Sequence, residues 1–310
     1  MSETRRVPWT VYAALSGQVL LSAGTYLAAR RAMEEVAPLN LVLWRFLLSS
    51  SVFVLLLLFT PGPKLPPPGL RLRVLLLGLV AGPINQGMFF LGLKSSSPAH
   101  ASLLYALTPA GVYLYLLSRG RERFTGRRAV GLMLAFSGVA VLLLGKGLAH
   151  SVGSLWGDAL ILSAVSAWVV YTSEGKPLSE RFGPLRATAW TMVCAGAWSW
   201  AMAPWTLSVD ALTRASPAAW ACLGYLGVLT SVVSYLLWYY ALSRLEASRV
   251  AVFSNLQPIV TAVMAWAVVG DVLPWEWGMG AVLVLVGVRV TQSAVSPARP
   301  AGAVAAHGNG

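Results

Sequence analysis

Ten apolar segments, each of about 20 residues, recur along this 310-residue chain and constrain its fold more than any other feature. A helix of about 20 apolar residues spans the roughly 30 Å hydrocarbon layer of a bilayer. Charged residues make up only 11% of the chain, against about 25% in soluble domains. The sequence therefore predicts an all-α polytopic membrane protein. Its ten transmembrane helices are expected at residues 9–29, 38–59, 71–93, 98–118, 126–145, 153–173, 184–204, 217–242, 247–269 and 275–293.

The basic residues are unevenly divided between the two sides that successive loops would face. Seventeen of the 23 Lys and Arg residues fall on the side of the N-terminus, five fall on the opposite side, and Arg45 lies inside a span. Short cytoplasmic loops are enriched in Lys and Arg, so both termini are predicted to be cytoplasmic in a bacterial inner (plasma) membrane. Residues 1–8 then form a cytoplasmic N-terminus and residues 294–310 a disordered cytoplasmic tail. The net charge of +12 reflects this orientation, and nucleic-acid binding is not expected.

Several classes of site are not indicated by the sequence. The three histidines show no metal-ligand spacing, and Cys194 and Cys222 both fall within spans, so no metal, cofactor or disulfide framework is expected. An intramembrane enzyme needs a recognisable nucleophile or base inside the spans, and none is evident. A channel needs a ring of selective groups, which the sequence does not identify.

The chain repeats itself at a nearly constant offset. At an offset of 149 residues the matching pairs are Leu93 and Leu242, Leu107 and Leu256, Pro109 and Pro258, Glu122 and Asp271, Gly131 and Gly280, and Gly138 and Gly287. Residues 38–44 match 184–190 at an offset of 146. We expect a five-helix repeat at 9–145 and a second at 153–293. Because five is odd, the second repeat must be inverted in the membrane, an arrangement typical of secondary transporters that bind substrate near the midplane.

Uncharged polar side chains occur at mid-depth in six of the ten expected spans. Such a group facing lipid costs several kcal/mol, so we expect these side chains to border an aqueous pathway between the repeats. Serines that merely bond back to their own helix are the alternative. The candidate substrate-binding residues, which include aromatic neighbours, are Gln18, Ser22, Gln86, Ser102, Tyr105, Ser163, Trp168, Tyr171, Ser234, Trp238, Asn255 and Gln257.

Two prolines and two segments rich in small residues suggest which parts of the chain move and which stay fixed. Pro109 and Pro258 each follow a polar residue inside an apolar segment, which predicts a bend that acts as a hinge or, alternatively, a fixed kink. The segments 126–145 and 275–293 carry small residues instead of polar ones and are expected to form a scaffold, or the face of a homodimer.

Arg45 is the one basic residue assigned to neither side of the membrane, because it lies one or two turns inside the second span. Its long side chain reaches outward to water in one interpretation, because it lies near the outer helix end. In the other interpretation it binds the carboxylate of a substrate. The sequence leaves both open.

Two long segments resemble the EamA type of the drug/metabolite transporter superfamily. LTPAGVYLYLLSRGRERFTGRRAVGLMLAFSG (107–138) and LQPIVTAVMAWAVVGDVLPWEWGMGAVLVLVG (256–287) each show a proline in the fourth span, an acidic residue and a glycine-spaced fifth span. PLNLVLWRF (38–46) is similar to the second span of that family, where an arginine often occurs. The resemblance implies a ten-helix exporter of small metabolites that works by alternating access.

We therefore expect an inner-membrane secondary transporter, not an enzyme, that exports amino acids with apolar or aromatic side chains. Its expected partners are the small-molecule substrate and the lipid bilayer. A multidrug exporter, or an exporter of other metabolites with the same fold, is the alternative. No carboxylate is expected at mid-membrane, so the source of energy stays open.

Overall fold

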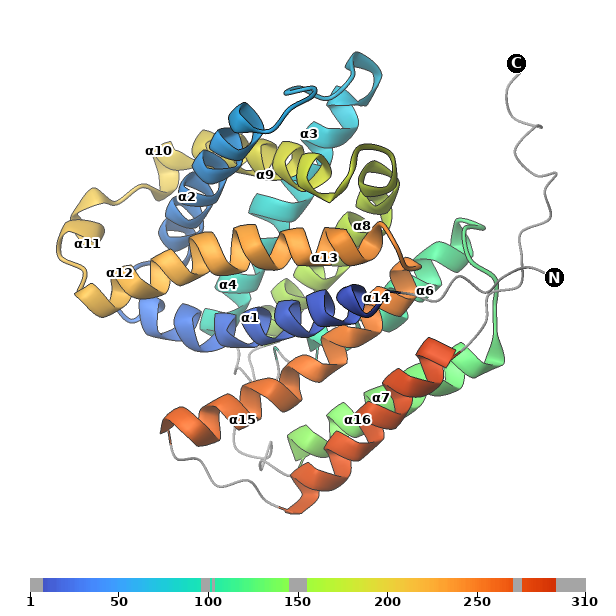
Figure 1. Cartoon of the computed structure of the whole chain (residues 1–310). Helices are drawn as coiled ribbons and strands as arrows, with labels where there is room; N and C mark the ends of the chain where they lie inside the picture. The colour runs from blue at the N-terminus through green and yellow to red at the C-terminus, as the bar shows by residue number, and fades with distance from the viewer. Residues whose placement is uncertain (1–7, 96–100, 102–103, 145–154, 270–274, 294–310) are drawn as a thin grey trace.

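The computed structural model describes residues 8–95, 101, 104–144, 155–269 and 275–293, and every regular element within them is helical (Figure 1). The first half contains α1 (Trp9–Met33), α2 (Pro38–Phe59), η1 (Pro68–Leu70), α3 (Arg71–Leu79), η2 (Val80–Gly87), α4 (Met88–Ser95), α6 (Thr108–Ser118) and α7 (Gly126–Leu144). The second half contains α8 (Leu155–Phe182), α9 (Pro184–Ala201), α10 (Ala203–Thr206), α11 (Val209–Thr213), α12 (Pro217–Gly224), η4 (Tyr225–Ser234), α13 (Tyr235–Leu242), α14 (Ala247–Ala251), η5 (Val252–Leu256), α15 (Gln257–Val269) and α16 (Trp275–Ser293). The all-helical prediction is confirmed, and each of the ten expected segments overlaps at least one helix.

Among the residues that the structure describes, five helical stretches are long and apolar enough to cross a bilayer. They are Trp9–Met33, Pro38–Phe59, Pro68–Ser95, Leu155–Phe182 and Pro217–Leu242. A shorter apolar stretch forms Gly278–Ser293 in α16. The full count of ten spans and the cytoplasmic position of the termini stay predictions. The predicted tail at 294–310 lies outside the described residues.

Local chemistry explains how α2 ends. The last carbonyl groups of a helix have no partner within it and need another donor. Lys64 Nζ supplies one, because it donates to the carbonyl oxygens of Leu57 at 2.6 Å, Leu58 at 2.9 Å and Thr60 at 2.6 Å. The chain then turns back through η1 into α3.

The third helix of each half contains a widened π-helical segment. In the first half this segment is η2, which contains Pro83. Proline has no N–H to donate, so the regular ladder of hydrogen bonds cannot continue through it. In the second half the segment is η4, where Ser231 Oγ donates to the carbonyl of Leu226 at 2.8 Å. Such segments are often found at functional sites, and these two occupy corresponding parts of the halves.

The two prolines expected to bend a helix instead stand at the start of one. Pro109 is the second residue of α6, and Pro258 is the second residue of α15, directly after the 3₁₀ segment η5. In the first turn of a helix the missing N–H of proline costs nothing. The polar-proline pairs therefore mark breaks between helical segments, and their role as hinges stays a prediction.

Helices α7 and α16 pack tightly against each other, side by side in Figure 1. A Cβ at Gly131 would lie 2.9 Å from the carbonyl oxygen of Gly287, and one at Gly138 would lie 2.7 Å from that of Gly280. The contacts run in opposite order along the two helices, so these helices are antiparallel. This is the arrangement that an inverted repeat requires of its two fifth helices.

The glycine-bearing faces of α7 and α16 are thus occupied within one chain. They were expected to serve as a scaffold or as the face of a homodimer, and their small residues serve the first role here. A homodimer through these helices would have to use their other faces, where Val130, Met133, Val282 and Leu285 are exposed.

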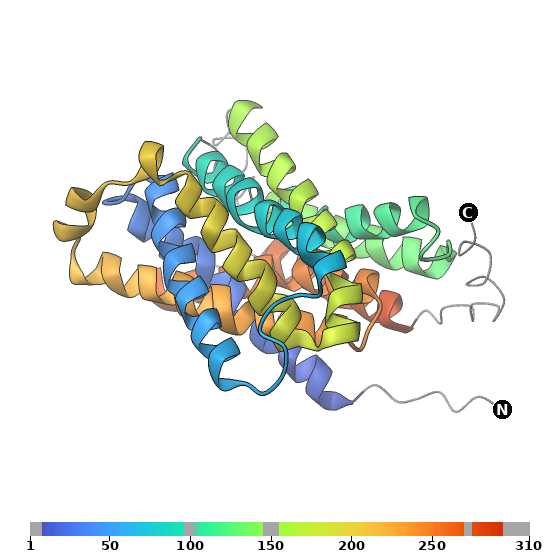
Figure 2. The same ribbon diagram turned by 90° about the horizontal axis from the view of Figure 1, so that it is seen from above.

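Two ion clusters join the halves at the end of the bundle where α3 and α14 begin. In one, Glu174 of α8 accepts from Arg73 at 2.8 Å, Arg121 at 2.7 Å and Tyr115 at 2.9 Å. In the other, the buried Arg128 of α7 binds Glu122 of its own half and Glu246 of the second half, and its Nη1 donates to Ser248 Oγ at 3.5 Å. α1 begins and α16 ends at this same end (Figures 1 and 2), which is the predicted cytoplasmic end.

A single added methyl group tests the α7–α16 contact. We expect Gly138→Ala to lower the free energy of unfolding by roughly 1–3 kcal/mol, because its Cβ would lie 2.6 Å from the backbone nitrogen of Val284. Gly278→Ala in α16 is the matched control, since a Cβ there meets no atom within 4 Å. Thermal unfolding of the purified protein in detergent measures both, and equal midpoints would contradict the proposed contact.

Candidate functional site

A pocket with about 610 Å³ of empty space, part of it open solvent, lies between the two halves. Among the described residues, none from α7, α9 or α16 lines it. The sixteen lining residues are Gln18, Ser22, Thr25, Tyr26, Arg45, Asn85, Gln86, Phe89, Tyr105, Trp168, Thr230, Ser234, Tyr235, Trp238, Ser254 and Gln257. Nine of them were singled out in the sequence.

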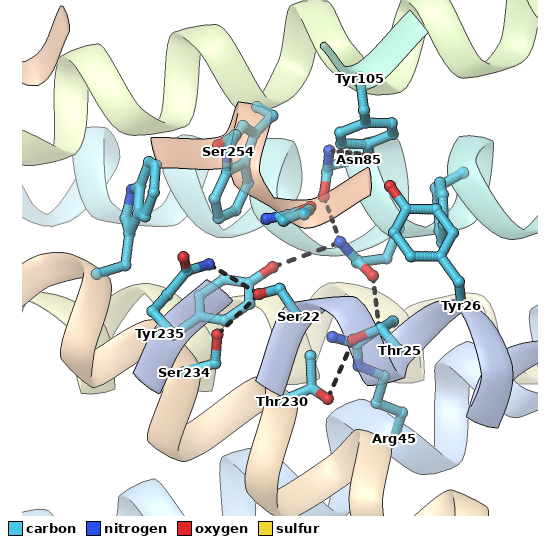
Figure 3. Close-up of a pocket in the computed structure, with 16 residues that line it drawn as sticks. Ser22, Thr25, Tyr26, Arg45, Asn85, Tyr105, Thr230, Ser234, Tyr235 and Ser254 are labelled. Carbon is cyan, nitrogen blue, oxygen red and sulfur yellow. Dashed lines mark hydrogen bonds between the residues drawn. The ribbon is translucent and has the colours of Figure 1, made fainter. Parts of the chain in front are cut away.

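Hydroxyl groups of α1 meet hydroxyl groups of η4 on one side of the pocket (Figure 3). Thr25 Oγ1 donates to Thr230 Oγ1 at 3.2 Å, and the hydroxyls of Ser22 and Ser234 lie 3.1 Å apart. Gln18 Nε2 donates to Ser22 Oγ at 2.7 Å. The other amide atom of Gln18, Oε1, is buried and has no partner among the described residues, which leaves an acceptor available at the pocket.

Arg45 lies deep in the interior, with only 1% of its surface exposed. Its Nε donates to Ser231 Oγ and its Nη1 donates to Gln86 Oε1, both at 2.6 Å. The interpretation in which Arg45 reaches outward to water is therefore wrong. Polar atoms from both halves hold the guanidinium at the pocket, and they can do so because η2 and η4 bring Gln86 and Ser231 to the same depth.

The amide of Gln86 is oriented by its neighbours. Its Nε2 donates to Asn85 Oδ1 and to Tyr235 OH, the latter at 3.4 Å. Asn85 is fixed in turn, since its Nδ2 donates to the carbonyl of Ala164 at 2.7 Å and to Tyr105 OH at 3.2 Å. These bonds leave the oxygen of Gln86 directed at Arg45.

An aromatic cluster from the second half forms another wall. The ring of Trp168 in α8 lies 5.4 Å from that of Tyr235 and 5.6 Å from that of Trp238, measured between centroids. Tyr171 stacks behind Trp168 at 5.6 Å, and its hydroxyl lies 3.1 Å from Thr191 Oγ1. Flat apolar faces of this kind suit an aromatic or aliphatic ligand group.

A second aromatic cluster comes from the first half. Phe89 packs edge to face against Tyr26 at 5.6 Å and against Tyr105 at 5.3 Å. The pocket is therefore flanked by aromatic rings on both sides, with amides, hydroxyls and Arg45 between them.

Equivalent positions of the two halves meet in this pocket. At the offset of 149, the lining residues pair as Asn85 and Ser234, Gln86 and Tyr235, Phe89 and Trp238, and Tyr105 and Ser254. The bond from Gln86 to Tyr235 joins two residues that correspond in this way. Asn85, Tyr235 and Ser254 are polar side chains of the expected lining spans but are not among the candidate binding residues, and applying the offset to chosen residues identifies them together with Phe89. Thr25 and Thr230 are also polar side chains of those spans, whereas Tyr26 was missed, although it lies one helical turn from Ser22.

Three of the candidate residues do not line the pocket. Ser163 lies on the exposed face of α8 and donates to the carbonyl of Ala159 at 2.9 Å, which is the back-bonding alternative. Tyr171 is fully buried behind Trp168, and Asn255 is buried in η5 and is not among the lining residues. The spacing of residues along a helix shows which of them share a face, but it does not show which other helix packs against that face. A fourth candidate, Ser102, lies outside the described residues.

Acidic and metal-binding groups do not gather at this site. No acidic side chain is among the sixteen residues that line the pocket. Across the residues that the structure describes, no three His, Cys, Asp or Glu side chains come close enough to hold a metal ion. The chemistry available at the pocket is thus hydrogen bonding, one positive charge and aromatic contact.

Comparison with known proteins adds independent findings. The model of the EamA-like transporter family matches residues 9–144 and again residues 155–292. The chain is 28% identical over 291 residues to an uncharacterized transporter, YyaM, of Bacillus subtilis, covering 92% of this chain and 94% of the relative. It is 26% identical to the uncharacterized inner membrane transporter YedA of Escherichia coli, covering 94% of each.

Two further similarities concern substrate and fold. A probable terminal-alkyne amino-acid exporter of Streptantibioticus cattleyicolor is 31% identical over 190 residues, which cover 61% of this chain and 62% of the relative. A crystal structure superposes with a TM-score of 0.73 at 17% identity, covering 91% of this chain and 96% of the other. This last similarity shows the fold alone.

Changes at Gln86 test whether it holds Arg45 in place. Gln86→Leu removes the acceptor of Arg45 Nη1, and we expect it to lower the free energy of unfolding by roughly 2–3 kcal/mol, because hydrogen bonds to charged groups contribute about that much. Gln86→Glu keeps an acceptor for Arg45 and adds a negative charge, but it loses the donor to Asn85 Oδ1, so it should unfold earlier than the wild type and later than Gln86→Leu. Thermal unfolding in detergent compares them. A Leu variant as stable as the Glu variant would show that Arg45 does not depend on this contact.

Proposed function

We propose, since the chain belongs to the EamA-like transporter family, that it is an inner-membrane secondary transporter that exports small metabolites. Amino acids with apolar or aromatic side chains are the proposed substrates. The proposed mechanism is alternating access between an inverted pair of repeats, with both termini cytoplasmic.

The composition of the pocket is the observation that carries this proposal. Amide, hydroxyl and guanidinium groups stand at its centre and can bind the polar head of an amino acid. Trp168 and Phe89 flank that centre and can pack against an apolar or aromatic side chain. The similarity to a probable terminal-alkyne amino-acid exporter supports the same class of substrate.

The position of the ion clusters supports alternating access. Glu174 and Glu246 of the second half bind arginines of the first half at the predicted cytoplasmic end. A substrate can pass that end only if the halves separate there, which requires these bonds to break. The clusters are therefore proposed to hold the cytoplasmic side closed in this conformation.

Counterflow in liposomes tests the transport proposal. Vesicles containing the purified protein, preloaded with an unlabelled amino acid, should accumulate the same labelled amino acid above the level of empty vesicles. Labelled nucleosides and dyes form the rest of the panel. Accumulation of dyes alone would favour a multidrug exporter, and accumulation of no solute would contradict transport of these classes.

Replacing one tryptophan tests the aromatic wall. We expect Trp168→Ala to lower the initial rate of amino-acid counterflow by about fivefold or more, because the substrate loses an aromatic face. Trp156→Ala on the same helix is the matched control, since the side chain of Trp156 is 69% exposed and lies outside the pocket. Equal rates in both variants would rule out contact between Trp168 and the substrate.

The cytoplasmic clusters can be tested with a cysteine reporter. In a background with Cys194→Ser and Cys222→Ser, Ser234→Cys places a thiol in the pocket. We expect Glu174→Ala to raise its labelling from the cytoplasmic side by about fivefold or more, because the cluster that closes this side is lost.

Glu180→Ala is the control for this experiment. Glu180 binds Lys176 of its own helix at 2.7 Å and does not join the halves. A membrane-impermeant maleimide applied to inside-out vesicles provides the measurement. If both glutamate variants label like the parent protein, the cluster does not restrain the opening.

A further inference from the structure

Arg45 is a cation with no counter-ion among the described residues. Its hydrogen-bond partners, Ser231 and Gln86, are neutral. The second terminal nitrogen, Nη2, bonds to none of the described residues, and Arg45 lines the pocket. The titratable side chains that act on it are Tyr105 and Tyr235, which carry no charge at neutral pH. A buried charge is normally paired with an opposite charge. None of the described residues that line the pocket supplies an anion for Arg45.

An ammonium group would find no corresponding partner in the pocket. The lining residues include no carboxylate among those described. Glu35 and Glu174 lie toward the two ends of the bundle and are already paired with arginines. A cation in the pocket would meet neutral acceptors, such as Gln18 Oε1, and would be repelled by Arg45.

We infer that the substrate is recognised by its carboxylate, through Arg45, and that an ammonium group is not required. The substrate class is then aromatic or apolar monocarboxylates, with amino acids as members that carry an additional amine. Lipophilic cations are excluded by the same charge. This inference rests on the proposed function and narrows it.

The geometry gives the carboxylate a defined place. Arg45 is held by Ser231 of the second half and Gln86 of the first, so its free nitrogen lies at the boundary between the halves. A carboxylate bound there neutralises the guanidinium and adds a charge-assisted hydrogen bond. The ring or aliphatic chain of the ligand then lies between the aromatic clusters of Trp168 and Phe89.

Three ligands that share a phenyl ring and a chain of similar length test the carboxylate and the ammonium group separately. They are 3-phenylpropionate, an anion; L-phenylalanine, a zwitterion; and 2-phenylethylamine, a cation. Binding to the purified protein in detergent at pH 7 is measured by isothermal titration calorimetry, because the uncharged forms of two of them diffuse through lipid. We expect 3-phenylpropionate and L-phenylalanine to bind, and 2-phenylethylamine to bind at least about tenfold more weakly.

Variants at two positions assign this preference to Arg45. Arg45→Gln should weaken binding of both carboxylates by about 10- to 100-fold, and Arg45→Lys, which keeps the charge, should restore part of the affinity. Gln86→Glu keeps Arg45 but supplies a counter-ion within the protein, so it should also weaken carboxylate binding. This second route keeps the test valid if Arg45→Gln fails to fold, and thermal unfolding of each variant shows which ones are folded.

Two results would overturn the inference. One is binding of 2-phenylethylamine as tight as that of 3-phenylpropionate, and the other is unchanged carboxylate binding in folded Arg45→Gln or Gln86→Glu. Failure of the proposed function is distinguishable, because it would appear as absence of counterflow for every solute while the order of binding stays as expected.

Discussion

A polar side chain within an apolar helix has to find a partner, and several of the polar side chains at the pocket find one across the boundary between the two halves. Thr25 bonds to Thr230, and Arg45 bonds to Ser231 in the same way. Gln86 bonds to Tyr235, its own counterpart in the repeat. Lipid offers no hydrogen bonds, so these groups must meet each other or water. The pocket therefore lies at a contact between the halves, and its polar groups form part of that contact.

Because the polar groups are concentrated at this boundary, helices such as α7 and α16 need only pack against their neighbours. α7 and α16 contribute no lining residue among those described, and their glycines bring the two backbones close together. Close backbone packing is a main source of association between helices in a bilayer, where burial of apolar surface adds little. The polar boundary has a different property, since hydrogen-bonded partners can be exchanged for water or substrate. The α7–α16 pair thus joins the two halves by backbone packing, whereas the polar boundary joins them through partners that water or a ligand can replace.

Much of the fold could be predicted from the sequence, whereas only part of the site could. The apolar segments located the described helices except the short η1 and α11, and the constant offset related Pro109 to Pro258. The same reasoning placed Ser163 at the pathway, yet that residue lies exposed and bonds back to its own helix. It also left open whether Arg45 reaches outward to water or binds the carboxylate of a substrate. The face of a helix that meets a neighbour depends on how helices from both halves pack, and a single helix does not contain that information.

The sequence by itself determined that this chain is helical, apolar enough for a membrane, and built from two related segments. Those properties follow from composition and repetition, which act locally along the chain. Only the tertiary structure decided which polar residues share one pocket, and that Arg45 is buried there beside Gln86 with no carboxylate near it among the described residues. The charge balance around Arg45 depends on every side chain that packs near it, and these side chains come from both halves of the chain.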